Sequence, residues 1–141
     1  MPSLDLPDRL GHHLLKKAAD HAFNAITITR AASENRPSEI IYVNDAFTDL
    51  TGYEAEDVLG ETPGVLQGPK TEQEVLDRLG RRLAAGEVFH GQTVNYRKDG
   101  SEFMMEWKVM PVGSGEKPVG EEGATHHVAV QREALDHQKE G

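Results

Sequence analysis

Apolar and polar residues alternate in two ways along the chain, first with the period of a helix and later with that of a strand. Between residues 8 and 23 the apolar side chains recur at every fourth position, which predicts an amphipathic helix. This stripe consists of Leu10, Leu14, Ala18 and Ala22. A helix ahead of a small sheet either covers that sheet or pairs with the same helix of a second subunit. Residues 1–8 contain two prolines and no periodicity, and they are predicted to form an arm.

Five later segments have the β-branched residues and the alternation that are typical of strands. They span residues 25–30, 39–44, 88–98, 102–112 and 124–131. The dipeptide Asp99-Gly100 is a strong signal for a hairpin between the third and the fourth strand. A loop rich in Asn, Pro and Ser joins the first two strands. The acidic, glycine-rich loop of residues 113–123 is predicted to be solvated and mobile.

The stretch from residue 42 to residue 67 predicts short helices that are broken by glycines. Asn44 follows an apolar strand and is a favourable N-cap, and Gly52 can end the helix that follows. A second short helix is expected at residues 54–59, before an irregular turn at residues 61–64. Short helices between a strand and a longer helix are typical of the wall of a pocket.

A longer helix is predicted over residues 71–85. Thr71 is a suitable N-cap, and Glu74 stands at the position of its partner in a capping box. The apolar stripe of this helix consists of Val75, Leu76, Leu79 and Leu83. Two strands, a helical excursion and three strands indicate an α+β fold with one antiparallel sheet, whose apolar face the helices cover.

Composition and charge narrow the possible functions. The length of 141 residues suits a single domain, and 37% hydrophobic residues suffice for a core. A formal net charge of −9 argues against nucleic acid and anionic membranes as partners, because both bind clustered Lys and Arg. No apolar run approaches the roughly 20 residues that span a bilayer, and no secretion signal is present at the N-terminus. A cytoplasmic location is therefore expected.

The sequence contains no constellation of residues that indicates an enzyme. Cysteine is absent, which excludes disulfides, thiolate nucleophiles and cysteinyl cofactor adducts. There is no nucleophile elbow, no phosphate-binding glycine loop and no zinc-protease motif. Adjacent histidines, as in His126-His127, point in different directions and are poor metal chelators. We therefore expect neither a catalytic nor a metal site.

Several motifs between residues 25 and 132 point to a known family. They are residues 42–47 (YVNDAF), 50–53 (LTGY), 66–69 (LQGP), 95–100 (NYRKDG) and 130–131 (VQ), together with Gly60. In these motifs the chain resembles a PAS domain, and among PAS domains the light-oxygen-voltage (LOV) type. The resemblance implies a five-stranded antiparallel sheet with helices over one face and an N-terminal helix outside the core. It divides the chain into residues 1–23, a PAS core at 24–132, and a tail at 133–141.

The chain departs from the flavin-binding LOV pattern at the positions that matter most for FMN. Pro63 stands where those relatives have the cysteine that forms an adduct with the flavin. Gly64, Asp77 and Gly80 stand where they have arginines that bind the phosphate. Met105 replaces one of two asparagines at the ring edge. The resemblance therefore implies a domain without flavin, with FMN as the alternative. Haem is not expected either, because residues 71–85 contain no histidine.

Eight residues are candidates for lining the cavity that this family has between sheet and helices. They are Gln67, Asn95 and Gln131, with Thr27, Thr29, Met105, Trp107 and His127 around them. The three amides either form an internal hydrogen-bond network or bind a ligand. Met105 and Trp107 are large enough to fill the space of a flavin ring. His127 is expected to face inward, either as a neutral, hydrogen-bonded core residue or as a pH-sensitive or ligand-contacting one.

Three hypotheses on function follow from this comparison. The first is a sensory or regulatory module without flavin that acts through homodimerisation and passes a signal to a partner, which the sequence does not identify. The second is a flavin photoreceptor without the adduct cysteine, in which Gln131 relays flavin reduction. The third is a purely structural association domain with a collapsed cavity. In the first hypothesis the dimer forms through the N-terminal helix and the outer face of the sheet, because the apolar stripe of that helix otherwise stays exposed.

Overall fold

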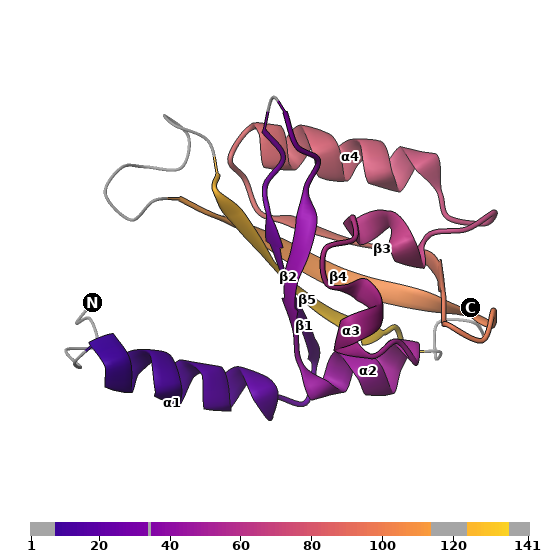
Figure 1. Cartoon of the computed structure of the whole chain (residues 1–141). Helices are drawn as coiled ribbons and strands as arrows, with labels where there is room; N and C mark the ends of the chain where they lie inside the picture. Colours follow the sequence, from indigo (N-terminus) through magenta and orange to yellow (C-terminus); the bar gives the residue numbers. More distant parts are fainter. Residues whose placement is uncertain (1–7, 34, 114–123, 136–141) are drawn as a thin grey trace.

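The computed structural model describes residues 8–33, 35–113 and 124–135. Outside these residues lie almost all of the predicted N-terminal arm, almost all of the loop predicted to be mobile, and most of the predicted tail. The described chain forms one sheet, a layer of helices on one of its faces, and one helix that stands apart (Figure 1). The α+β class predicted from the order of elements is confirmed.

The sheet has five strands, and every neighbouring pair is antiparallel, as predicted. The strands are β1 (Ala25–Arg30), β2 (Glu39–Val43), β3 (Phe89–Tyr96), β4 (Glu102–Val112) and β5 (His126–Glu133). Their order across the sheet is β2-β1-β5-β4-β3, so the last strand lies in the centre. β5 begins and ends two residues later than predicted, because Glu133 still pairs with Met105 of β4. The predicted end of the core at residue 132 therefore falls inside a strand.

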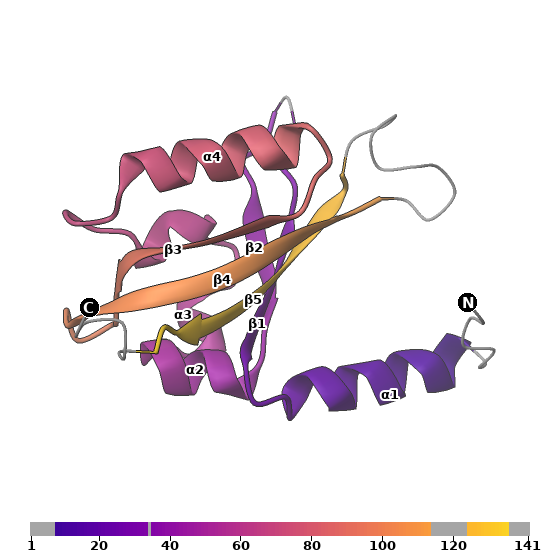
Figure 2. The same ribbon diagram turned by 180° about the vertical axis from the view of Figure 1, so that it is seen from behind.

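The helices lie on one face of the sheet, with one exception. They are α1 (Asp8–Asp20), α2 (Asp45–Thr51), α3 (Ala55–Val58), the 3-10 helix η1 (Pro63–Leu66) and α4 (Gln73–Ala84). In Figure 1, α2, α3 and α4 stand in front of the sheet, and Figure 2 shows the opposite face without a helix across it. The core between the two layers includes Phe47, Val58, Phe89 and Trp107, all 6% exposed or less.

The ends of α2 follow the sequence prediction. Asn44 has extended backbone angles, and its side chain accepts a hydrogen bond from the amide of Phe47, which satisfies one of the free donors of the first turn. Gly52 ends the helix with φ = 80°, a left-handed conformation that is costly for residues with a Cβ atom. The predicted break between the two short helices is therefore confirmed.

The predicted capping box of the longer helix is wrong. Helix α4 begins at Gln73, and its N-cap residue, Glu72, makes no side-chain capping bond. The Thr71 hydroxyl instead accepts from the amide of Gly68 at 3.0 Å and donates to the carbonyl of Val94 at 2.7 Å. The Thr71 hydroxyl thus links the loop before α4 to β3 instead of capping the helix.

Helix α1 is shorter than predicted and is attached to the sheet only near its C-terminal end. It stops at Asp20, so Ala22 of the predicted stripe lies outside it. The hydroxyl of Tyr42 on β2 donates to Asp20 at 2.6 Å, and the amide of Asn44 donates to the carbonyl of Ala19 at 2.8 Å. Burial, followed by this hydrogen bond, raises the pKa of the Tyr42 phenol, and the same bond lowers the pKa of Asp20. The contact therefore persists at neutral pH.

Two glycines near the helical layer provide a paired stability test. Gly80 lies inside α4, and a Cβ atom there would meet nothing within 4 Å. We expect Gly80→Ala to raise the free energy of unfolding by about 0.5–1 kcal/mol, because alanine loses less backbone entropy on folding. A Cβ atom on Gly68 would instead overlap the ring of Tyr96, whose hydroxyl accepts from the amide of Lys70 at 3.0 Å. Gly68→Ala should lower stability by about 1–3 kcal/mol.

Chemical denaturation of both variants checks this prediction, since the substitution is the same and only the surroundings differ. Equal effects of the two substitutions would contradict the close approach of Gly68 to the Tyr96 ring.

Candidate functional site

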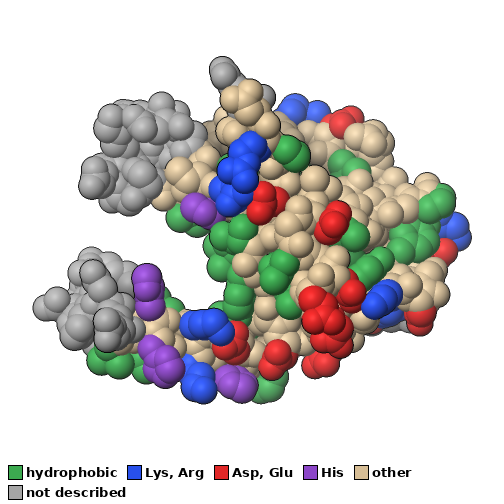
Figure 3. Space-filling model, viewed as in Figure 1, with side chains coloured by type: hydrophobic (Ala, Val, Ile, Leu, Met, Phe, Trp, Pro, Cys, Tyr) green, Lys and Arg blue, Asp and Glu red, His purple; other side chains and the backbone are tan. Residues whose placement is uncertain are grey.

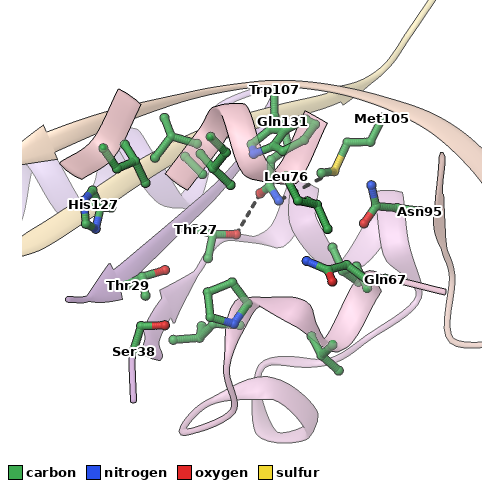
Figure 4. Close-up of a pocket in the computed structure, with 18 of the residues that line it drawn as sticks. Thr27, Thr29, Ser38, Gln67, Leu76, Asn95, Met105, Trp107, His127 and Gln131 are labelled. Atoms are coloured by element: carbon green, nitrogen blue, oxygen red, sulfur yellow. Dashed lines mark hydrogen bonds between the residues drawn. The ribbon is translucent and has the colours of Figure 1, made fainter. Parts of the chain in front are cut away.

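A cavity of about 330 Å³ lies between the inner face of the sheet and the helical layer (Figure 4). Its walls come from all five strands on one side, and from α2, η1 and α4 on the other. The volume lies near the lower end of the range of small-molecule sites, which is about 300–1,000 Å³. Met105 and Trp107, the two large side chains considered able to fill this space, leave it open. The ring of Trp107 instead packs against Phe89, with ring centroids 5.0 Å apart.

All eight predicted residues border the cavity. They are Thr27, Thr29, Gln67, Asn95, Met105, Trp107, His127 and Gln131. Strand alternation explains the agreement, since every second residue of a strand faces the same side of the sheet. Whether these residues bind a ligand stays a proposal.

Three amide side chains form one polar part of the wall, which we call the amide end: Gln67, Asn95 and Gln131. The oxygen of Gln131 accepts from the hydroxyl of Thr27 at 2.7 Å, and its nitrogen lies 3.8 Å from the Met105 sulfur. Asn95 is 3% exposed and makes only a long bond of 3.4 Å to the carbonyl of Thr93. The side chain of Gln67 makes no hydrogen bond to the described residues. Hydrogen bonds within the protein therefore occupy the side chain of Gln131. The amides of Asn95 and Gln67 remain largely available to a ligand.

A second polar part of the wall, which we call the histidine end, consists of Thr29, Ser38 and His127. Thr29 and His127 are directly paired across β1 and β5, and Ser38 precedes β2. Figure 4 shows these three residues on one side of Thr27, with Asn95 and Gln67 on the other. Ser38 was not among the predicted residues, because it lies in a loop whose path no periodicity predicts.

The imidazole of His127 makes no hydrogen bond to the described residues, in contrast to the hydrogen-bonded core residue that one of the two interpretations of the sequence assumed. Its Nε2 atom is shielded from solvent and has no partner within the described part of the chain. Burial, with a smaller effect from the nearby charge of His126, lowers the pKa of His127 below its ordinary value. The ring therefore offers one donor and one acceptor at neutral pH, and no charge.

This lowered pKa predicts a pH dependence of stability. The unfolded chain takes up the proton at a higher pH than the folded protein, so the folded state loses stability as pH falls below about 6.5. We expect the unfolding free energy to fall more steeply between about pH 7 and pH 5 in the native protein than in His127→Leu. Denaturant titrations over this range measure both slopes. Parallel slopes would show that His127 does not contribute.

The described part of the wall has partners for the edge of a flavin ring but none for the phosphate of FMN. Among the described residues, the lining contains no Lys, Arg, Asp or Glu. Pro63 borders the cavity, and Gly64 adds no side chain. Asp77 is exposed on α4 and accepts from Gln73 at 2.9 Å. A phosphate would therefore lack the cations that bind it in proteins, and the residues present do not fit FMN as a whole.

Outside the cavity, the described residues offer little further chemistry. They contain no group of three or more His, Asp or Glu residues that could hold a metal ion. No described helix is long and apolar enough to cross a membrane. Acidic side chains gather over α2 and α3 (Figure 3). The acidic residues on or directly next to these two helices are Asp45, Asp49, Glu54, Glu56 and Asp57.

Comparisons with known proteins agree with this architecture. The profile of the PAS domain family matches residues 25–128. The bacterioopsin transcriptional activator of Halobacterium salinarum is 35% identical over 139 residues, which cover 96% of this chain and 19% of that protein. Blue-light-activated histidine kinase 1 of Erythrobacter litoralis is 38% identical over 62% of this chain and 23% of its own. A solved RNA-binding light-oxygen-voltage receptor has a TM-score of 0.78 and 28% identity, over 94% of this chain and 36% of that one.

The five-stranded antiparallel sheet with helices over one face is the fold of LOV domains. The chain belongs to the PAS domain family, and it is similar in structure and sequence to LOV domains. The absence of cysteine agrees with the predicted loss of the adduct residue. Domains of this type are parts of signalling proteins and are generally not catalytic. The chain spans less than a quarter of the length of either curated relative.

Proposed function

We propose that this chain is a sensory module that responds to a small molecule in its cavity, without a flavin. The observation that carries the proposal is the wall of the cavity, whose described residues include amides and a histidine with a lowered pKa but no cation for a phosphate. The absence of cysteine excludes the covalent photochemistry of LOV domains. The sensory role thus rests on reversible binding, which shifts the domain between two arrangements.

The signal leaves the domain through a homodimer, which PAS domains commonly form. The outer face of the sheet supports this, because apolar side chains there alternate with those that line the cavity. The apolar residues of this outer patch are Ile26, Ile28, Met110, Val112, Val128 and Val130. Leu10 and Leu14 of α1 are 44% and 46% exposed and form a second apolar surface. A second copy covers both surfaces and buries what a monomer leaves in water.

A flavin-binding photoreceptor without the adduct cysteine is the second candidate. The observation in its favour is the amide end, since Asn95 and Gln131 can bond the edge of a ring. It requires a flavin without a bound phosphate, or one whose phosphate stays in water. A purely structural domain with a collapsed cavity has less support, because about 330 Å³ stays open.

Some parts of the proposal rest on the sequence alone. A cytoplasmic location and the exclusion of nucleic acid remain predictions, the latter from the net charge of −9.

Native mass spectrometry of the purified chain, with its visible absorption spectrum, tests the proposal. We expect a dimer that carries a non-covalent mass and lacks the absorption of oxidised flavin. A flavin spectrum from cells that supply flavin would support the second candidate instead. A dimer that never carries or accepts a small molecule would favour the structural one.

A further inference from the structure

We propose that the histidine end is a second ligand subsite, and that the cavity takes an uncharged, elongated molecule with a hydrogen-bonding group at each end. Thr29, Ser38 and His127 bind one terminal hydroxyl or carbonyl, while the amide end binds the other. This inference rests on the proposed function, because it assigns the class of ligand to the same cavity.

The two ends are separated along the strands that carry them. His127 and Gln131 lie four residues apart on β5 and face the same cavity. A strand rises about 3.3 Å per residue, so the two side chains are about 13 Å apart along the strand. Thr27 lies between the two ends in Figure 4, and its hydroxyl is already bonded to Gln131. A ligand that reaches both ends is therefore long rather than compact.

The histidine end has hydrogen-bonding capacity that the described protein does not use. His127 Nε2 is shielded without a partner, and the hydroxyls of Thr29 and Ser38 make no side-chain hydrogen bonds to described residues. Buried polar atoms are nearly always paired, and an unpaired one is costly. A hydroxyl both donates and accepts, so it satisfies either tautomer of the imidazole. These three side chains, converging from β1, β5 and the segment before β2, thus fit one terminal polar group.

The absence of charge in the described lining sets the charge of the ligand. A carboxylate or an ammonium group in this cavity would lie among neutral side chains, without an ionic partner. Between the ends the wall is apolar, with Leu76, Leu79, Val109 and Ala129 among its residues. The ligand class is therefore an apolar body, either a chain or a narrow ring system, with a neutral polar group at each end.

Three linear eight-carbon probes separate the parts of this proposal: a diol with hydroxyls at both ends, the mono-alcohol, and the dicarboxylate. Titration calorimetry on the whole chain, freed of any bound molecule, measures their affinities. We expect the diol to bind about tenfold more tightly than the mono-alcohol, because its second hydroxyl forms one additional buried hydrogen bond. The dicarboxylate should not bind.

Variants show whether the histidine end produces this preference. In His127→Leu and in the shape-conserving Thr29→Val, the diol and the mono-alcohol should bind with similar affinity. His126→Leu makes the same change as the first variant at a neighbouring position that does not border the cavity, and it should keep the tenfold preference. Thermal unfolding of each variant confirms that it is folded.

The outcomes distinguish the inference from the proposed function. If the mono-alcohol and the diol bind the native protein equally, or if both variants keep the preference, the second subsite is wrong and the cavity is still a binding site. If no probe binds and the purified chain carries no small molecule, the proposed function itself fails. Binding of the dicarboxylate would overturn the assignment of an uncharged ligand.

Discussion

Replacing Asn44 with alanine will lower the free energy of unfolding by about 3 kcal/mol and release α1 from the domain. The Asn44 side chain is 3% exposed and makes four hydrogen bonds. Its oxygen accepts from the amides of Ile26 at 2.8 Å and Phe47 at 3.1 Å. Its nitrogen donates to the carbonyls of Ala19 at 2.8 Å and Asn24 at 3.1 Å. Loss of the helix cap costs about 1 kcal/mol, and each partner left buried and unpaired adds to this.

Two further variants divide this effect into its parts. Asn44→Asp keeps the acceptor that caps α2 and bonds Ile26, but it cannot donate to the carbonyl of Ala19 in α1 or to that of Asn24 before β1. It should therefore retain α2 while amide hydrogen exchange in α1 becomes faster. Asn35→Ala is the matched control, because Asn35 is exposed and its side chain makes no hydrogen bond to the described residues. A loss from Asn44→Ala as small as that of the control would contradict the prediction.

The bonds of Asn44 join the wall of the cavity to the helix outside the core. Phe47, on the first turn of α2, borders the cavity, and its amide is bonded to Asn44. The side chain of Asn44 also donates to the carbonyl of Ala19 near the end of α1. A ligand that displaces α2 therefore also acts on α1, which we propose to be part of the dimer interface. The buried side-chain amide of Asn44 connects the two helices.

The Asn44 side chain also shows which hydrogen bonds could be predicted from the sequence and which could not. Its role as N-cap was predictable, because the cap bond joins residues three positions apart, and local patterns predict such bonds. Its nitrogen donates to the carbonyls of Asn24 and Ala19, which lie 20 and 25 positions earlier in the chain. These bonds depend on where α1 and the segment after it lie. Thr71 was misjudged for the same reason. Its pattern fitted a cap, but a distant carbonyl on β3 and the preceding loop use the hydroxyl instead.

The cavity was predictable where strands build it and not where loops do. Alternation on β1, β4 and β5 was sufficient to place Thr27, Met105 and His127 on its wall. Ser38 lies in the connection between β1 and β2, where no period constrains the direction of a side chain. The sequence also could not show that His127 Nε2 has no partner among the described residues, because this depends on which polar groups approach from other segments.

A single charge in the outer patch of the sheet will convert the proposed dimer into a monomer. Val128 lies in the middle of this patch, paired with Ile28 on β1 and with Met110 on β4. In Val128→Glu a carboxylate would be buried between two copies without an ionic partner, whereas in the monomer it reaches water. We expect the Kd of the dimer to rise by at least about 100-fold. Size-exclusion chromatography with light scattering measures the mass of the particle directly.

Val88→Glu is the matched control for this experiment, because Val88 is 47% exposed and precedes β3, outside the outer patch. It should leave the dimer intact. Leu14→Glu tests the contribution of α1 separately, since Leu14 is 46% exposed on a helix that the sheet does not cover. A dimer that survives Val128→Glu but not Leu14→Glu would place the interface on the helix alone. A dimer that survives both would exclude the two surfaces, and the apolar outer face would then need a partner other than a second copy of this chain.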